Sequence, residues 1–176
     1  MVKSSFLDMG VKSIGFGTGG QRIDQLARKI KDFRPVFRAI RPTVQQVYAD
    51  KFKAQGPGWK KHASNTIIMH GQHSILNLSG RLERSMSKKA KGSHSRTYRK
   101  RMVHGTTLKY ATYVGRGFTQ QVTSKMKGFL GARGVNVGLN STLKVPRRNF
   151  ERISKKDERR IRDHAEKVMR MLVKKI

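Results

Sequence analysis

A single acidic residue, Glu83, lies between Lys51 and Phe150, while lysine and arginine recur throughout that stretch. Over the 176 residues, 40 Lys and Arg stand against 10 Asp and Glu, which gives a net charge of +30. A chain with this imbalance repels itself, so we expect it to act against a polyanion or an acidic protein surface. The other acids fall mostly in segments with a helical pattern. The sequence thus predicts a charge-mixed scaffold at both ends and a cationic middle.

The length allows one domain with a hydrophobic core, and we expect that domain to span 1–176, with an N-terminal arm over 1–20. The chain has no cysteine, which excludes disulfides and thiolate metal sites. No apolar run approaches the length of a membrane span, and the first ten residues lack the apolar core of a signal peptide. These features fit a protein made and used in a cytoplasm.

Two helical patterns occupy the N-terminal part of the chain. Apolar residues recur at helical spacing before and after Pro35, at Ile23, Leu26, Ala27, Ile30, Phe33, Phe37, Ile40, Val44, Val47 and Tyr48. Proline lacks an N–H and clashes with the preceding turn, so we expect two helices, at about 21–33 and 35–54. Pro42 is unfavourable inside the second helix and can shift its start. A short strand is expected earlier, at 11–16.

The middle of the chain predicts shorter elements. The glycines and proline of 55–58 break the helix, and Trp59, the only tryptophan, is expected in the core. The spacing of Ile67, Ile68, Gly71 and Ile75 predicts a helix over 65–75 with these residues inward. A helical turn is expected after Gly80, and loose alternation predicts a strand over 96–108. The segment 118–140, rich in Gly, Thr, Ser and Lys, is expected to be a flexible loop or hairpin.

The clearest element is a C-terminal helix. Ser154 is a good N-cap, and Asp157 follows three residues later, where its charge suits a helix N-terminus. The apolar residues then form one stripe, made of Ile161, Ala165, Val168, Met171 or Leu172, and Ile176. Lys174 and Lys175 close the helix at the end where cations are favoured.

Motifs for chemistry are weak in this sequence. The glycines of 15–20 fit G-x-G-x-x-G, but a helix is expected where a dinucleotide site needs a second strand and an acid. Gly128, Gly131 and Gly134 are interpreted as loop glycines, because 135–139 does not have the pattern of the second helix that a KH-type clamp needs. His70 and His73 share a helical face but lack nearby acids to complete a metal site. We therefore predict no enzyme, no cofactor and no metal.

The run of cations over 86–101, a predicted basic arm, is the sharpest functional signal. No acid lies between Glu83 and Glu151 to compensate it, and Tyr98 offers a stacking face among the cations. Contact with phosphates or with an acidic protein is favoured over a merely solvated loop, and sequence-specific DNA reading is disfavoured. The predicted contact residues are Lys88, Lys89, Lys91, Arg96, Arg99, Lys100, Arg101, Arg116, Lys125, Lys127 and Arg133.

Three segments occur in a recognisable order: Ile75-Leu-Asn-Leu-Ser-Gly-Arg-Leu-Glu-Arg-Ser85, Tyr110-Ala-Thr-Tyr-Val-Gly-Arg-Gly117 and Val145-Pro-Arg-Arg-Asn-Phe150. In this order the chain resembles the virion-morphogenesis, or tail-completion, proteins of Mu-like and P2-like phages, and more distantly the head–tail joining proteins of long-tailed phages. The resemblance covers about Trp59 to the C-terminus. The chain departs from the family after its Tyr-Ala segment and in its long, cationic 86–101 and 118–140 segments. Structural roles are expected for Trp59, Gly80, Leu82, Tyr110, Ala111, Pro146 and Phe150, with Tyr110 and Tyr113 on a sheet face.

The resemblance implies an α+β fold, with amphipathic helices packed on a small curved antiparallel sheet and with long basic loops. It also implies a subunit of a homo-oligomeric, hexameric ring in the virion neck or at the tail top, assembled in the host cytoplasm. The expected partners are connector or adaptor proteins, tail-tube or tail-terminator proteins, and DNA in the neck channel, with no membrane. The alternative is a free-standing basic nucleic-acid-binding protein of the ribosome- or nucleoid-associated type, which the composition alone would favour.

Overall fold

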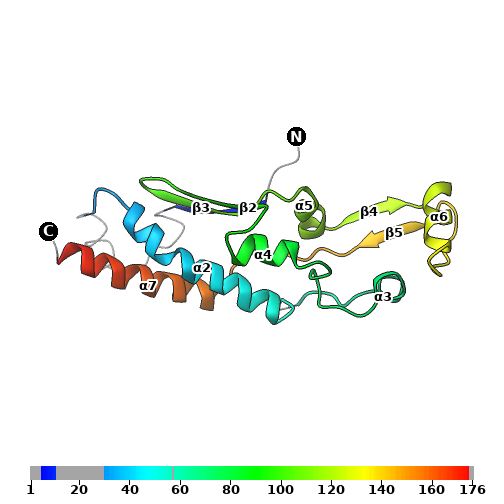
Figure 1. The fold of residues 1–176 in the computed structure, drawn as a ribbon, viewed down its shortest axis with the longest axis horizontal. Coiled ribbons are helices and arrows are strands. Elements are labelled where there is room, and N and C mark those ends of the chain that lie inside the picture. The colour runs from blue at the N-terminus through cyan, green and yellow to red at the C-terminus, as the bar shows by residue number, and fades with distance from the viewer. Residues whose placement is uncertain (1–4, 11–29, 57, 175–176) are drawn as a thin grey trace.

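The computed structural model describes residues 5–10, 30–56 and 58–174 of the chain. The fold is α+β, as predicted. The described elements are β1 (Ser5–Gly10), α2 (Arg34–Lys53), α3 (Ser64–His70), α4 (Arg81–Ser87), β2 (Ser93–Thr97), β3 (Arg101–Thr106), α5 (Lys109–Arg116), β4 (Phe118–Gln121), α6 (Ser124–Gly131), β5 (Thr142–Val145) and α7 (Lys155–Val173). The molecule is elongated, with α2 and α7 at one end and α6 at the other (Figure 1).

Three layers make up the larger part, which we call the body. The antiparallel sheet β1–β3–β2 and helix α4 lie on one side of α2, and α7 lies on the other (Figure 1). The smaller part, which we call the extension, is residues 118–145. It consists of the antiparallel pair β4–β5, which matches Phe118 with Val145 and Gln121 with Thr142, and of α6 between the two strands.

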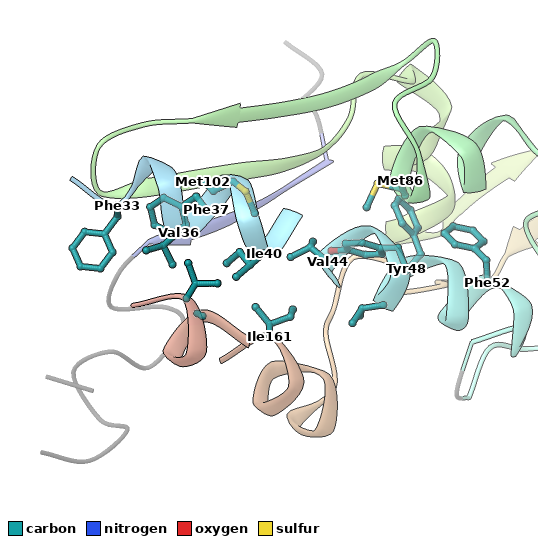
Figure 2. Packing of buried hydrophobic residues seen from close by; sticks show 14 of the residues in the cluster. Phe33, Val36, Phe37, Ile40, Val44, Tyr48, Phe52, Met86, Met102 and Ile161 are labelled. Carbon is teal, nitrogen blue, oxygen red and sulfur yellow. The ribbon is translucent and has the colours of Figure 1, made fainter. Parts of the chain in front are cut away.

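The core forms around α2 because its apolar residues recur at helical spacing. Val36, Phe37, Ile40 and Val44 are all fully buried. In Figure 2 they lie between Met102 of the sheet and Ile161 of α7. Full burial of each such side chain contributes about 1.5–3 kcal/mol relative to exposure, so this stripe holds the three layers together.

Pro42 lies inside α2, and the helix continues through it from Arg34. The predicted shift of the helix start is therefore wrong. Pro42 cannot bond to the carbonyl four residues earlier, on Arg38, but both residues are exposed, so water can reach that carbonyl. Pro35 instead occupies the first turn, where proline is well tolerated.

The N-terminal predictions lie largely outside the described residues. These are the strand at 11–16, the glycines of 15–20 and most of the helix at 21–33. In the described part, 30–33 is not helical, so that helix does not reach Phe33. Ile30 and Phe33 are nevertheless buried against the core.

Two predicted elements of the middle are corrected. The strand over 96–108 is a hairpin, because β2 and β3 pair antiparallel with Thr97 opposite Met102. The helix over 65–75 is only α3, which ends where Gly71 takes a φ of +70°. Its Ile67 and Ile68 are 42% and 56% exposed rather than inward, whereas Ile75 is buried.

The C-terminal helix is confirmed as α7. Ser154 caps it, since its Oγ accepts from the Asp157 amide at 3.2 Å and donates to the Asp157 carboxylate at 2.5 Å. Ile161, Ala165 and Val168 form the buried stripe as predicted, joined by Met169; of the two alternatives, Leu172 packs half-buried against the core and Met171 is exposed, while Ile176 lies outside the described residues. No helix in the described part of the chain is both long and apolar enough to cross a membrane.

Candidate polyanion or partner interface

The predicted basic arm is not a free arm, because most of it is the β2–β3 hairpin of the body. The hairpin turn lies against the start of α2, where the Phe33 amide donates to the Arg99 carbonyl at 2.9 Å. Arg99 Nε donates back to the Lys31 carbonyl at 3.1 Å, and Arg41 donates to Thr97 Oγ1 at 2.8 Å. The hairpin therefore presents its cations from a fixed surface.

The hairpin divides the basic run into two groups. Lys88, Lys89 and Lys91 precede β2, whereas Arg99, Lys100 and Arg101 lie at the turn, and all six are exposed. A strand rises about 3.3 Å per residue, so the two groups are about 20 Å apart along β2. Neighbouring cations in the sequence thus lie at two different places on the surface.

Tyr98 is 40% exposed at the turn, and the Arg101 guanidinium lies over its ring at 4.8 Å from the centroid. This cation–π contact occupies one face of the ring. The predicted stacking face is therefore partly taken by the chain itself. Arg96 is exposed on β2, opposite Val103 in the register.

The remaining predicted contact residues belong to the other end of the molecule. Arg116 ends α5 at the base of the extension, while Lys125, Lys127 and Arg133 lie on or beside α6. All four are exposed, and the extension, 118–145, contains no acid. Figure 1 shows α6 at the opposite end of the molecule from the β2–β3 turn, so the structure does not bring all predicted contact residues together.

The extension also carries a surface that the sequence pattern did not predict. Phe129 and Leu139 are 53% and 50% exposed, and the Arg133 guanidinium lies 3.9 Å from the Phe129 ring centroid. A Cβ placed on Gly134 would lie 3.7 Å from Ile68 Cγ2, which brings α3 beside this region. We call the side chains of Ile67, Ile68, Phe129 and Leu139, with Lys125, Lys127 and Arg133, the tip surface. In the sequence these apolar residues lie among cations, and we assigned Ile67 and Ile68 to the inward face of a helix and Phe129 and Leu139 to a loop or hairpin.

The predicted structural residue Phe150 packs against α5 and α2 where the extension joins the body. Phe150 is fully buried, 6.4 Å from the Phe52 ring, and a Cβ on Gly115 would lie 3.1 Å from it. The Arg148 amide donates to the Val114 carbonyl at 3.2 Å. Leu82, Ala111 and Trp59 are buried as well, Pro146 is half-buried, and Gly80 takes a left-handed φ of +67° that permits the predicted turn.

Tyr110 and Tyr113 are the exception among these residues. They lie on helix α5 rather than on a sheet, and they are 39% and 52% exposed. Tyr110 lies near Arg81 and Arg84 of α4, and partial burial raises the pKa of its hydroxyl. Residues three apart share one face of a helix but lie on opposite faces of a strand, so the prediction that both tyrosines lie on one sheet face was wrong.

A half-buried cation, Lys51, bonds to the chain between the extension and α7. Lys51 Nζ donates to the carbonyls of Asn149 at 3.1 Å, Phe150 at 2.9 Å and Arg152. Burial lowers the pKa of Lys51 to about 8. Lys51 is thus a structural residue that the sequence pattern did not single out.

The histidines form no metal site in the described residues, where no group of three or more potential ligands is found. The rings of His62 and His73 are 4.3 Å apart, and those of His70 and His73 6.4 Å. Burial, His73 and Arg148 lower the pKa of His62. Burial disfavours the charged form of the His62 imidazole.

One groove lies between α2 and α7, lined by residues that include Thr43, Asp50, Asp163 and His164. Its polar groups pair with one another: Arg160 binds Asp50 at 2.8 Å, and Thr43 Oγ1 is 2.6 Å from His164 Nδ1. Hydrogen bonds from Arg160 and Gln46 lower the pKa of Asp50, which suits an ion pair rather than a general acid.

Comparison with family models, curated proteins and solved structures finds no match to this chain. The resemblance to tail-completion proteins therefore rests on the three segments 75–85, 110–117 and 145–150. In the structure these segments contribute α4, α5 and the return of the chain from the extension.

Proposed function

We propose that this protein is a structural subunit of a tailed-phage virion, a tail-completion or head–tail joining protein that assembles as a ring in the neck or at the tail top. It is not an enzyme in this proposal. Its partners are other subunits of a hexameric ring, connector or adaptor proteins, tail-tube or tail-terminator proteins, and DNA in the neck channel.

One observation carries the proposal: two of the ordered segments that resemble the phage family, 110–117 and 145–150, pack against each other, and the third, 75–85, contributes charges near them. Phe150 packs beside Gly115 of α5, and the Arg148 amide bonds to the Val114 carbonyl of the same helix. Tyr110 of α5 lies near Arg81 and Arg84 of α4. Segments that share one joint are expected to occur together in a family for structural reasons, so their joint location supports the resemblance.

The cationic groups fit the same function. Lys88, Lys89 and Lys91, the turn at 99–101 and the α6 region point to separate parts of the surface. A ring subunit has several neighbours at once, whereas a compact phosphate-binding patch would gather its cations on one face.

The experiment is light scattering on the nuclease-treated protein after size exclusion. We expect a discrete oligomer near six times the 20.1 kDa subunit mass, or a ring that forms on addition of a connector protein. Negative-stain images of that species should show a ring. A protein that stays monomeric alone and with connectors, while binding DNA tightly, would contradict the proposal.

The second candidate is a free-standing nucleic-acid-binding protein, favoured by the net charge of +30. It predicts tight binding to duplex DNA with a salt dependence of log K near −0.9 per phosphate contacted. Within the neck proposal, charge reversal at the turn, with Arg99→Glu, Lys100→Glu and Arg101→Glu, tests what the turn contacts. A neck subunit whose turn faces DNA loses DNA affinity and keeps its ring mass, whereas a loss of assembly with unchanged DNA binding would assign the turn to a protein neighbour.

A further inference from the structure

Most of the large hydrophobic side chains that the described chain leaves exposed lie toward one end of the molecule. Ile67, Ile68, Leu78, Tyr110, Tyr113, Phe118, Phe129 and Leu139 lie in the extension, in α5 at its base, or in α3 and the loop that follows. Only Tyr98 and Met171 lie elsewhere among the described residues of this kind. Exposed apolar side chains gathered in this way mark an interaction surface.

The extension cannot bury these side chains itself. Its own buried apolar residues are Val122, Leu130 and Val135, and these are not part of the main core cluster. Every residue of β4 is exposed, and α3 has no buried residue. An isolated pair of strands is marginally stable in water, so contact with a partner would add the burial that the extension lacks.

The charge of the tip surface specifies the chemistry of that partner. Lys125 and Lys127 lie in the same helix as Phe129, the Arg133 guanidinium lies 3.9 Å from the Phe129 ring centroid, and no acid lies within 118–145. An acidic surface is therefore complementary. The aliphatic side chains of Ile68 and Leu139 argue against phosphates, which cations and polar groups bind and which offer no apolar contact.

A second copy of the chain is a poorer occupant. Two of its acids, Asp50 and Glu166, already pair with Arg160 and Arg170. On α7, lysines and arginines outnumber the aspartates and glutamates. The body of another copy thus offers cations to a cationic tip.

We propose that the tip surface docks onto a different protein, one whose surface has an apolar pocket rimmed by Asp and Glu. The inference rests on the proposed function, because it assigns one neighbour of the ring subunit to the extension. Phe129 enters the pocket with Arg133 stacked on its ring, while Lys125 and Lys127 pair with the acidic rim. Aromatic and arginine side chains at the centre of an interface carry most of its binding energy.

The test uses the full chain and three fluorescent probes measured by anisotropy. The first probe is a helical peptide with Leu and Phe on one face and Glu beside them. The second is poly-glutamate of the same charge, and the third is a short DNA duplex. We expect the first probe to bind, Phe129→Ser to weaken it about tenfold, and Lys125→Glu with Lys127→Glu to weaken it by a similar factor.

The chain provides a matched control. Tyr98 with Arg101 is a second exposed aromatic ring under an arginine, at the other end of the molecule. Tyr98→Ser should leave the affinity for the first probe unchanged, and circular dichroism should show that all variants are folded. Leu139→Ser, a separate apolar truncation, should reproduce the loss seen with Phe129→Ser.

Three results would overturn the proposal. Equal binding of poly-glutamate and the first probe, with no effect of Phe129→Ser, would show that charge alone accounts for binding. Loss of duplex affinity in Phe129→Ser would assign the tip to nucleic acid. A fall in oligomer mass in Phe129→Ser would assign it to a second copy. If the wild type forms no ring but still binds the first probe through Phe129, the proposed function fails and the docking surface stands.

Discussion

The body and the extension both carry an excess of positive charge, but they differ in how much of their apolar surface they bury. The body buries a continuous apolar stripe of α2 between two layers and leaves most of its cations at the surface. The extension has cations without acids, three buried apolar residues and a set of exposed ones. The apolar burial that stabilises the fold is therefore in the body, whereas the extension leaves apolar side chains exposed to solvent. Most of the structural cost of mutation should therefore fall on the body.

The largest effect is expected from a matched pair of phenylalanines. Phe150→Ala removes a fully buried ring beside Phe52 and should lower the free energy of unfolding by about 3–5 kcal/mol. Phe129→Ala, on the half-exposed ring of the tip, should change it by less than about 0.5 kcal/mol. Urea unfolding followed by tryptophan fluorescence measures both, since Trp59 lies against Phe52. Equal losses in the two variants would mean that the extension has a core of its own.

A pair of glycines tests the joint between the two parts. Gly117 has a φ of +71°, and a Cβ there would lie 2.7 Å from the Arg147 amide and the Val145 carbonyl. Gly117→Ala should therefore cost about 1–3 kcal/mol. Gly128→Ala, in α6 with nothing within 4 Å, should stabilise by about 0.5–1 kcal/mol. Thermal unfolding of both variants checks the opposite signs, and a neutral Gly117→Ala would show that the joint yields easily.

Acid should weaken the body more than the region around α3. His104 is buried between the Met86 carbonyl and the Tyr48 ring, and burial, with Arg41 and His94 nearby, lowers its pKa. The unfolded chain then takes up a proton first as the pH falls through about 6.5, so stability present above that pH is lost below it. The slope of unfolding free energy against pH should be smaller in His104→Gln.

His62 is the control for this pH dependence. Its pKa is also lowered, by burial, His73 and Arg148, but it is half-buried beside α3. His62→Gln should therefore remove a smaller part of the slope than His104→Gln. A larger part would place the acid-sensitive contacts in the α3 region.

The smallest effect compares two helix caps. Ser154→Ala removes the cap of α7 and should cost about 1 kcal/mol in global stability. Thr123→Ala removes the Thr123 Oγ1 bond to the Met126 amide at 3.3 Å, which caps α6. We expect this second change to speed hydrogen exchange in α6 with little effect on the global midpoint. If Thr123→Ala lowered the global midpoint as well as the protection of α6 from exchange, the body and the extension would unfold as one unit.

The long helices could be predicted from the sequence because burial and helical period agree there. The stripe of α2, the Ser154 cap and the buried Trp59 and Phe150 all follow from local pattern and residue type. The α+β class follows from the same patterns. The order of the segments 75–85, 110–117 and 145–150 suggested the family resemblance, but it did not predict that the last two pack against each other.

The errors arise where local pattern and tertiary contact disagree. The β2–β3 turn, at Tyr98, Arg99 and Lys100, has no glycine or proline to mark it, so one strand was expected in place of two. In α6, Gly128 and Gly131 lie in a helix despite their low helix propensity, which made the segment look like a loop. Ile67 and Ile68 match a buried face in sequence, but among the described residues they remain largely exposed.

The antiparallel pairing of β4 and β5 has a mechanical consequence. Both strands leave the body at one base, and α6 closes the far end as a continuous chain. A pull on the tip along the long axis is therefore shared by two covalent backbones, and the ladder hydrogen bonds between them carry almost no load. Rupture under tension should begin at the base, where Phe150 and the Lys51 ammonium hold the returning strand, so the extension behaves as a tether whose strength is set by its anchorage.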